Sequence, residues 1–197
     1  MQLKHFPASS SAILIIDMTL HFSNEGDENY QRRFWEVARN IAALKQMALA
    51  AGSHAIYVNT CFASKAAFYE SPMAGKSEPL WIRGTKDVQI VDPLQPQEGD
   101  SIIEKSVMSC FFGTALESIL QQLSVRWLIL TGVHTHVCIL LTAADAFYRG
   151  YQVLVPEDCV TTIDLQRHEF GLRYVNRHLG QTTSTTELKN LLVPNKK

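Results

Sequence analysis

The sequence predicts an α/β fold in which a parallel sheet is covered by helices on both faces. Short continuous apolar runs, such as residues 12–16 and 127–130, suit strands that are buried on both sides. Segments whose apolar residues recur at steps of three and four, as in residues 30–51, alternate with these runs and favour helices. This alternation implies right-handed strand–helix–strand units, which place their strands parallel to one another.

The expected elements follow one another along the chain with one long interruption. Strands are expected at residues 12–16, 55–58, 101–105, 127–130, 151–155 and 181–185. Helices are expected at residues 30–51, from Gly113, from Cys138 and from Asp164 to about residue 179, with a last helical turn at 187–192. We expect Phe170 and Tyr174 to point inward from the helix that Asp164 caps.

The interruption is residues 62–100, which show no strong apolar period and contain many proline and glycine residues. A long irregular stretch inside a compact domain is usually a lid, a binding loop or an excursion with short elements. Trp81 and Arg83 are its most notable side chains.

Composition and charge exclude several classes of function. The 197 residues are 46% hydrophobic, and 18 basic residues nearly balance 19 acidic ones without forming a basic block. Binding to nucleic acid or to a membrane surface is therefore not expected. The first residues lack the features of a signal peptide, so a cytoplasmic location is expected. In that compartment the four scattered cysteines are expected to be free thiols.

Three residues with reactive side chains follow predicted strands. Asp17 ends the first strand, Lys105 ends the third, and Cys138 opens the helix after the fourth. Ligands of parallel sheets bind beyond the carboxyl ends of the strands, so these side chains are expected to converge. The positive end of a helix is expected to push a thiol at Cys138 toward the thiolate. Each residue also has a structural interpretation: a buried cysteine, a capping aspartate and a surface lysine.

Three motifs carry a resemblance to a known family. They are I-I-D-M at 15–18 followed by Phe22, E-K-S-V-M-S-C-F-F-G-T at 104–114, and T-G-V-H-T-H-V-C at 131–138. Together they resemble the isochorismatase-like cysteine hydrolases, which include nicotinamidases, N-carbamoylsarcosine amidases and ureidoacrylate hydrolases. Over nearly the whole chain, the resemblance implies a single domain, residues 1–197, with a Rossmann-like three-layer α/β/α sandwich. It also implies a six-stranded parallel sheet in the order 3-2-1-4-5-6, and a homo-oligomer, either a dimer or a tetramer.

The same resemblance implies which residues form the site. Asp17, Lys105 and Cys138 would be a catalytic triad, and the backbone N–H groups of His134 and Cys138 would form an oxyanion hole. The peptide bond between Val133 and His134 would be cis. Candidate substrate-binding side chains are aromatic, and core packing remains open for each of them: Phe22, Trp81 and Phe111.

Two departures from the family pattern bear on cofactor and substrate. Nicotinamidases carry a metal-binding D-x-H motif after the second strand, whereas residues 59–65 here read N-T-C-F-A-S-K. Neither a metal nor another cofactor is therefore expected, and nicotinamide is not an expected substrate. Thr19 replaces the glutamine that often follows the first aspartate of the family. The sequence does not name the small-molecule substrate, although Arg83, Arg149 and Arg167 are candidates to bind a carboxylate.

The expected activity is metal-independent hydrolysis of the C–N bond of a small amide or ureido compound through a thioester. The presence of Cys138 favours this reaction, because isochorismatases proper cleave a vinyl ether and often lack the cysteine. Vinyl-ether hydrolysis of that type remains the first alternative. A non-catalytic oligomeric binding protein that has kept the pocket is the second.

Overall fold

The computed structural model describes residues 7–75 and 78–192 and contains one parallel sheet. Its main path has the strand order β3-β2-β1-β4-β5-β7, which confirms the predicted order, with the predicted sixth strand appearing as β7. A short additional strand, β6, pairs with β4 beside this path. The strands are β1 Ser11–Ile16, β2 His54–Thr60, β3 Ser101–Lys105, β4 Trp127–Val133, β5 Gln152–Pro156, β6 Val160–Thr161 and β7 Gln181–Thr183.

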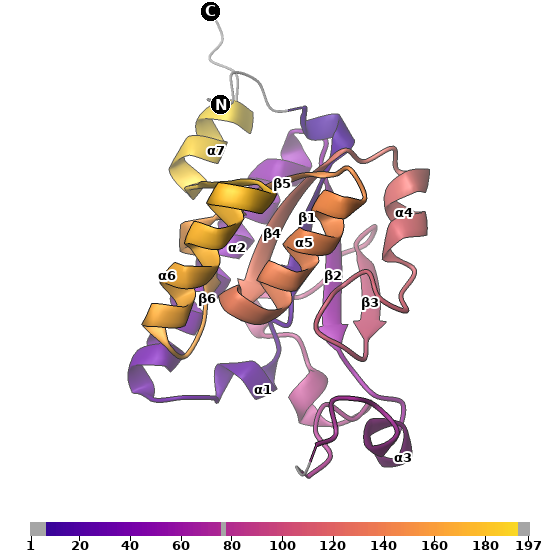
Figure 1. The fold of residues 1–197 in the computed structure, drawn as a ribbon. Coiled ribbons are helices and arrows are strands. Elements are labelled where there is room, and N and C mark those ends of the chain that lie inside the picture. The colour runs from indigo at the N-terminus through magenta and orange to yellow at the C-terminus, as the bar shows by residue number, and fades with distance from the viewer. Residues whose placement is uncertain (1–6, 76–77, 193–197) are drawn as a thin grey trace, which may run out of the picture.

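Helices cover the sheet on both faces, as Figure 1 shows. The helices are α1 Leu20–Ser23, α2 Glu28–Ala50, α3 Lys65–Tyr69, α4 Leu116–Gln122, α5 Leu140–Tyr148, α6 Leu165–Tyr174 and α7 Thr185–Leu192. Two π-helical turns, Thr135–Ile139 and Val175–Leu179, precede α5 and follow α6. None of the helices within the described ranges is both long and apolar enough to cross a bilayer.

Alternate residues of the central strand β1 belong to two separate hydrophobic cores. Ile13 and Ile15 pack in the core that contains the apolar side chains of α2 and α7. Leu14 and Ile16 pack in the opposite core, which contains residues of α4 and α5 and the turn Val175–Leu179. Because successive strand side chains point to opposite faces, a fully apolar strand is what a three-layer sandwich requires.

The helix starts follow from capping side chains. The Asp27 carboxylate accepts the Tyr30 N–H at 2.8 Å and starts α2 two residues earlier than the apolar pattern indicated. Asp164 caps α6 as expected, by accepting the N–H groups of Gln166 and Arg167. Such caps satisfy N–H groups that the helix itself leaves without a partner.

The prediction that Phe170 and Tyr174 point inward is wrong. Their side chains are 50% and 43% exposed, respectively. α6 instead approaches its neighbours through Gly171, where an added Cβ would lie 3.0 Å from the Thr135 carbonyl oxygen. The period of apolar residues did not reveal that a glycine makes the close contact.

Residues 62–100 form an excursion with short elements at the carboxyl ends of the strands. Besides α3, it contains the 3₁₀ turns Lys86–Val88 and Asp92–Leu94. A small core of its own holds Phe62 and Phe68, and in Figure 1 α1 and α3 both lie beyond the tips of β2 and β3. This arrangement brings the excursion next to the residues that follow β1, β3 and β4.

Candidate active site

The sheet brings Asp17, Lys105 and Cys138 together. Asp17 directly follows β1, Lys105 is the last residue of β3, and Cys138 lies in the π-helical turn after β4. The Lys105 ammonium is 2.7 Å from a carboxylate oxygen of Asp17 and 3.5 Å from the Cys138 sulfur. All three side chains are buried. An ammonium that contacts a carboxylate and a thiol in a buried site is an arrangement suited to nucleophilic chemistry.

The backbone at Asp17 adopts a conformation that is uncommon for a non-glycine residue, with φ of 56°. Such strain persists only where the surroundings hold it, and it concentrates at functional sites. Its N–H donates to the Val58 carbonyl, and its Oδ1 accepts from both the N–H and the hydroxyl of Thr60, at 2.7 and 2.9 Å. Beside it, a Cβ on Gly132 would lie 2.0 Å from the Ile16 carbonyl oxygen, so the strands require glycine there.

Lys105 keeps its proton in this site. Burial is the largest single influence and by itself would lower its pKa, but the charge and hydrogen bond of Asp17, together with the nearby Cys138 and Cys110, raise the pKa above the ordinary value. The ammonium also donates to the Thr60 hydroxyl at 2.7 Å and to the Val107 carbonyl at 3.3 Å. The Thr60 hydroxyl therefore bridges Lys105 and Asp17, a role that nothing in the sequence around the end of β2 indicated.

The positive end of the helix by itself favours the Cys138 thiolate, but the other surroundings of the thiol shift its pKa in the opposite direction. Burial raises the pKa of its thiol, the charge of Asp17 raises it further, and the opposing charge of Lys105 does not compensate. The sequence correctly placed the cysteine in the first turn of a helical segment. It contained no information about how completely the surrounding side chains would exclude water. At rest the sulfur is therefore protonated and needs a base.

Backbone hydrogen bonds to His134 hold the turn between β4 and α5. The peptide bond between Val133 and His134 is cis. The His134 carbonyl accepts the N–H groups of Val137 and Ile139 at 3.0 and 3.2 Å, on either side of Cys138. The Thr162 hydroxyl, which follows β6, lies 3.1 Å from Nδ1 of His134. The position of Cys138 is thus set by backbone bonds within the turn and by a side chain outside it.

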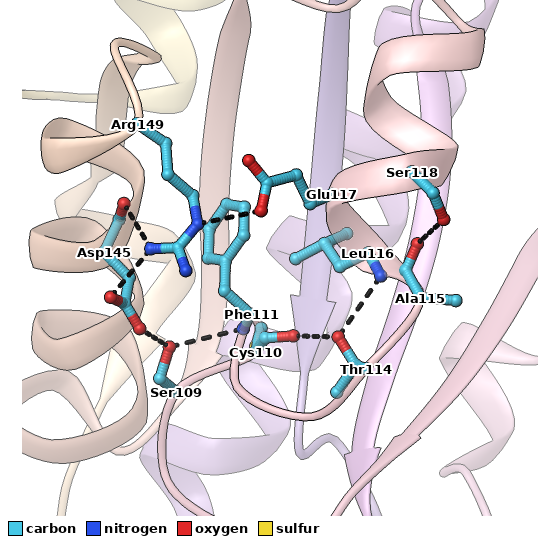
Figure 2. Close-up of polar contacts among 10 residues, drawn as sticks. All are labelled: Ser109, Cys110, Phe111, Thr114, Ala115, Leu116, Glu117, Ser118, Asp145 and Arg149. Carbon is cyan, nitrogen blue, oxygen red and sulfur yellow. Dashed lines mark hydrogen bonds and ion pairs between the residues drawn. The ribbon is translucent and has the colours of Figure 1, made fainter.

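A side-chain hydrogen bond connects the loop that follows Lys105 to α5. Figure 2 shows the Ser109 hydroxyl donating to Asp145, whose carboxylate also pairs with Arg149 at 2.9 Å. Arg149 in turn pairs with Glu117 of α4 at 3.2 Å. Because α5 continues from the turn that holds Cys138, these contacts connect the lysine loop to the cysteine turn.

Phe111, a candidate substrate-binding residue, belongs to this anchoring group and does not line the cavity at the triad. Figure 2 shows its ring beside the Arg149 side chain. The centre of the ring lies 4.8 Å from the guanidinium carbon of Arg149 and 5.8 Å from the centre of the Tyr151 ring. The side chain is buried in the core that contains α4 and α5. The aromatic pair at 111–112 did not indicate which partner the ring would meet.

A cavity of about 160 Å³ opens onto Cys138 and Lys105. Of the candidate aromatic residues, Phe22 and Trp81 line it, with their rings stacked at 5.9 Å and an angle of 17°. Sequence reasoning missed several lining residues, because no local pattern distinguishes a side chain that faces the cavity: Glu25, Thr60, Met73, Met108 and Val137, together with the side chain of His134. Their convergence depends on how the residue 62–100 excursion and the α1 segment fold over the strand ends.

Glu25 is the unexpected charged residue in this cavity. Its two carboxylate oxygens lie 3.2 Å from Nε2 of His21 and 2.9 Å from Nε2 of His134. Burial alone would raise its pKa, but the hydrogen bonds and charges of the two histidines lower the pKa to about 2. Glu25 is therefore a carboxylate at any pH at which the protein would work.

None of the three candidate arginines lines the cavity. Arg83 pairs with Glu104 on an exposed part of β3, and Arg167 lies 3.5 Å from Asp164 at the start of α6. Arg149 is held by Glu117 and Asp145, as described above. Within residues 7–75 and 78–192, no three His, Cys, Asp or Glu side chains are grouped so that they could hold a metal ion.

Comparison with known proteins identifies the family of this chain. The model of the isochorismatase domain matches residues 11–187. The isochorismatase family protein YaaI of Bacillus subtilis is 27% identical over 91% of this chain and 96% of its own. The ureidoacrylate amidohydrolase RutB of Yersinia enterocolitica is 31% identical over 78% of this chain and 76% of its own.

Among solved structures, a cysteine hydrolase from Pseudomonas syringae superimposes with a TM-score of 0.87 and 23% identity, covering 98% of this chain and 97% of the other. This likeness concerns the fold, while the family match covers the strands that position Asp17, Lys105 and Cys138. The chain is a hydrolase of the isochorismatase family.

Proposed function

We propose that the protein hydrolyses the C–N bond of a small amide or ureido compound through a thioester on Cys138. The observation that carries this proposal is the buried Cys138 thiol, 3.5 Å from a lysine that is itself 2.7 Å from Asp17. The RutB relative, named as an amidohydrolase, supports the same reaction class.

In the first step Asp17 accepts the thiol proton while the Cys138 sulfur attacks the substrate carbonyl. The raised pKa of the thiol makes this transfer part of the attack, because little thiolate exists beforehand. Lys105 stays protonated and offsets the negative charge that moves between Asp17 and the sulfur. The oxyanion of the tetrahedral intermediate is held by the backbone N–H groups of His134 and Cys138.

In the second step the protonated Asp17 gives its proton to the leaving nitrogen, and the C–N bond breaks. The acyl group then remains on the sulfur as a thioester. Asp17, again a carboxylate, takes a proton from water as that water attacks the thioester carbonyl. The C–S bond breaks, the thiol regains a proton and the carboxylic acid, or carbamic acid from a ureide, is released. No metal or redox partner enters this sequence.

The two alternatives make less use of the same residues. Vinyl-ether hydrolysis needs an acid and a charge, but it does not need a buried thiol in contact with Lys105. A non-catalytic binding protein needs neither the strained Asp17 backbone nor the paired charges behind the cavity. The thiol is the feature that favours amide hydrolysis over both.

The test is ammonia release over a panel of primary amides and ureides. The Cys138→Ala variant is expected to lose activity at least about a thousandfold while keeping its unfolding transition. The control is Cys159→Ala. It removes a buried thiol from the hydrophobic core on the other face of the sheet and is expected to stay active. Full activity of Cys138→Ala on a substrate that the wild type cleaves would show that another group is the nucleophile.

We also propose that the protein is a homo-oligomer through α5 and α6. Of the eleven large apolar side chains exposed in the described part of the chain, seven lie on these helices or just before α6. The two helices lie side by side on one face in Figure 1. These seven are Leu141, Phe147, Tyr148, Ile163, Leu165, Phe170 and Tyr174.

An apolar patch of this kind commonly marks a protein interface. Light scattering is expected to give a dimer or tetramer for the wild type and a smaller species for Tyr148→Glu. Tyr69→Glu, which alters an exposed tyrosine of α3 away from this patch, is the control and should leave the mass unchanged. A monomeric wild type would reject the proposal.

A further inference from the structure

The two carboxylate oxygens of Asp17 have different surroundings. Oδ1 accepts two hydrogen bonds from Thr60, one from the backbone nitrogen at 2.7 Å and one from the hydroxyl oxygen at 2.9 Å. Oδ2 lies 2.7 Å from the Lys105 ammonium, but it has no partner with hydrogen-bond geometry among the described residues. Leaving a buried polar atom without a hydrogen bond costs free energy, so Oδ2 is kept open against a cost.

The hydrogen atoms of the Lys105 ammonium are directed to other acceptors. An ammonium has three N–H donors and no acceptor. The three acceptors that Lys105 meets with hydrogen-bond geometry are the Thr60 hydroxyl at 2.7 Å, the Val107 carbonyl at 3.3 Å and the Cys138 sulfur at 3.5 Å. This set leaves no hydrogen atom for Asp17. Lys105 therefore attracts Oδ2 by its charge and leaves the lone pairs of that oxygen open to another proton.

The Thr60 hydroxyl can serve its two neighbours in only one way. A hydroxyl carries one hydrogen atom and two lone pairs, whereas an ammonium can only donate. The Thr60 oxygen therefore accepts from Lys105, and its own hydrogen atom is left for Oδ1 of Asp17. This order of donors holds whether or not Asp17 carries a proton. With two donors directed at Oδ1, a proton on Asp17 is better placed on Oδ2.

The Cys138 thiol is the proton donor that Asp17 meets in this site. The charge of Asp17 and a hydrogen bond between its carboxyl and the thiol both raise the pKa of Cys138. Because Thr60 already fills Oδ1, Oδ2 is the oxygen with room for the thiol proton. Asp17, Thr60, Lys105 and Cys138 are all buried, so bulk water does not compete for the open lone pairs.

Resting on the proposed role of Asp17 as the base, we infer that Thr60 is a positioning residue that assigns the proton transfers to Oδ2 of Asp17. It fills Oδ1 with two hydrogen bonds and accepts the Lys105 hydrogen atom that would otherwise turn to Oδ2. As the sulfur attacks the carbonyl, the S–H bond breaks and an O–H bond forms at Oδ2. The same oxygen gives this proton to the leaving nitrogen and later takes one from the attacking water.

Substitutions of Thr60 separate the effect of its hydroxyl from the effect of its shape. Thr60→Val keeps the shape and removes the hydroxyl, whereas Thr60→Ser keeps the hydroxyl and removes the methyl group. We expect kcat for ammonia release to fall about thirtyfold in Thr60→Val and to stay within about threefold of the wild type in Thr60→Ser, with KM changed by less than about threefold in both. A packing role predicts the opposite order, with valine tolerated and serine not.

That opposite order would overturn the inference. A raised KM with unchanged kcat in Thr60→Val would also overturn it, because the hydroxyl would then bind the substrate. Thr60→Ala is the second variant without a hydroxyl, in case Thr60→Val does not fold. It differs from Thr60→Ser by the hydroxyl alone and is expected to show the same loss of kcat as Thr60→Val.

The matched control is Thr131→Val. Thr131 is a buried threonine of β4 whose hydroxyl donates to the Leu14 carbonyl at 2.8 Å. The substitution removes a buried hydroxyl of the same kind from the same sheet and is expected to leave kcat unchanged, while urea unfolding records the stability that each valine variant loses. A loss of kcat in Thr131→Val equal to that in Thr60→Val would reject a specific role for Thr60.

Alkylation of Cys138 by iodoacetamide tests the same proton transfer without amide hydrolysis. The sulfur displaces iodide while the thiol proton passes to the base, and peptide mass spectrometry follows the product. The rate is expected to fall about tenfold in Thr60→Val and Thr60→Ala and to stay near the wild-type rate in Thr60→Ser. This result without ammonia release from any amide would reject the proposed hydrolysis and keep the role of Thr60. Equal rates in all variants would overturn that role even if the hydrolysis is confirmed.

Discussion

The strand-built part and the loop-built part of the site are held in different ways. In the strand-built part, Asp17, Lys105 and Cys138 follow or end the parallel strands β1, β3 and β4, are buried, and the charges of Asp17 and Lys105 are paired. In the loop-built part, Phe22, Glu25 and Trp81 come from loops and a short helix, and Glu25 is partly exposed. The sheet thus places the reactive groups, while the loops supply much of the cavity wall. This division is common in parallel α/β folds, whose loops vary on a rigid scaffold.

The largest effect is expected from a substitution in the strand-built part of the site. Asp17→Asn removes the base and leaves Lys105 buried beside a neutral side chain. We expect kcat to fall about a thousandfold, and the free energy of unfolding to fall by about 3–5 kcal/mol because a buried charge loses its partner. Steady-state kinetics and urea unfolding measure the two effects. Asp92→Asn, at an exposed aspartate, is the control. Retention of wild-type stability would contradict the paired-charge description.

A substitution that touches no catalytic side chain tests whether strand spacing positions the triad. Gly132→Ala combines φ of 110° with a Cβ 2.0 Å from the Ile16 carbonyl oxygen. We expect it to lower the free energy of unfolding by about 3 kcal/mol and to lower kcat as well.

The Gly84→Ala variant separates the cost of a positive φ from the cost of a steric clash. Gly84 also has positive φ, 84°, but an added Cβ there meets nothing within 4 Å. A loss of only about 1 kcal/mol is expected for it in the same denaturant titration. Equal losses for the two variants would mean that the close approach of β1 and β4 does not matter.

The smallest effect is expected from a substitution of Glu25, in the loop-built part of the site. Because the pKa of Glu25 is about 2 in the folded protein and its ordinary value is 4.5, its ionisation stabilises the folded state above pH 4.5. This stabilisation is lost as the pH falls from 4.5 toward 2. After discounting for solvent screening, we expect the free energy of unfolding of the wild type to exceed that of Glu25→Gln by about 1 kcal/mol at neutral pH.

Thermal unfolding from pH 7 down to pH 2 measures this dependence. The difference in unfolding temperature between wild type and Glu25→Gln is expected to shrink as the pH falls through the acidic range. The control is Glu36→Gln, at an exposed position on α2, whose unfolding temperature should follow that of the wild type throughout. A difference that grows in acid would contradict the assigned sign of the Glu25 shift.

Most of the fold was predictable because its signals are local. The apolar runs of β1 and β4 and the caps at helix starts depend on neighbouring residues, and the sheet order followed from the family motifs. The exposure of Phe170 was not predictable, since it depends on a glycine contact between distant segments. The short strand β6, two residues long, gave no pattern at all.

The site was predictable in the same unequal way. The positions of Asp17, Lys105 and Cys138 follow from where strands end, whereas Glu25 and Thr60 acquire their roles through tertiary contacts. The direction of the overall pKa shift at Cys138 was not predictable from the sequence, for a related reason. The positive end of a helix is visible in the sequence, but the burial that opposes it is not.

The central claim is a covalent acyl group on Cys138. Rapid acid quenching of the enzyme during turnover of a cleaved amide, followed by intact-mass and peptide mass spectrometry, tests it most directly. A mass increase equal to the acyl group is expected on the peptide that contains Cys138, and it is expected to be absent from Cys138→Ala. Continued turnover with an unmodified Cys138, or an adduct on a different thiol such as Cys110, would contradict it.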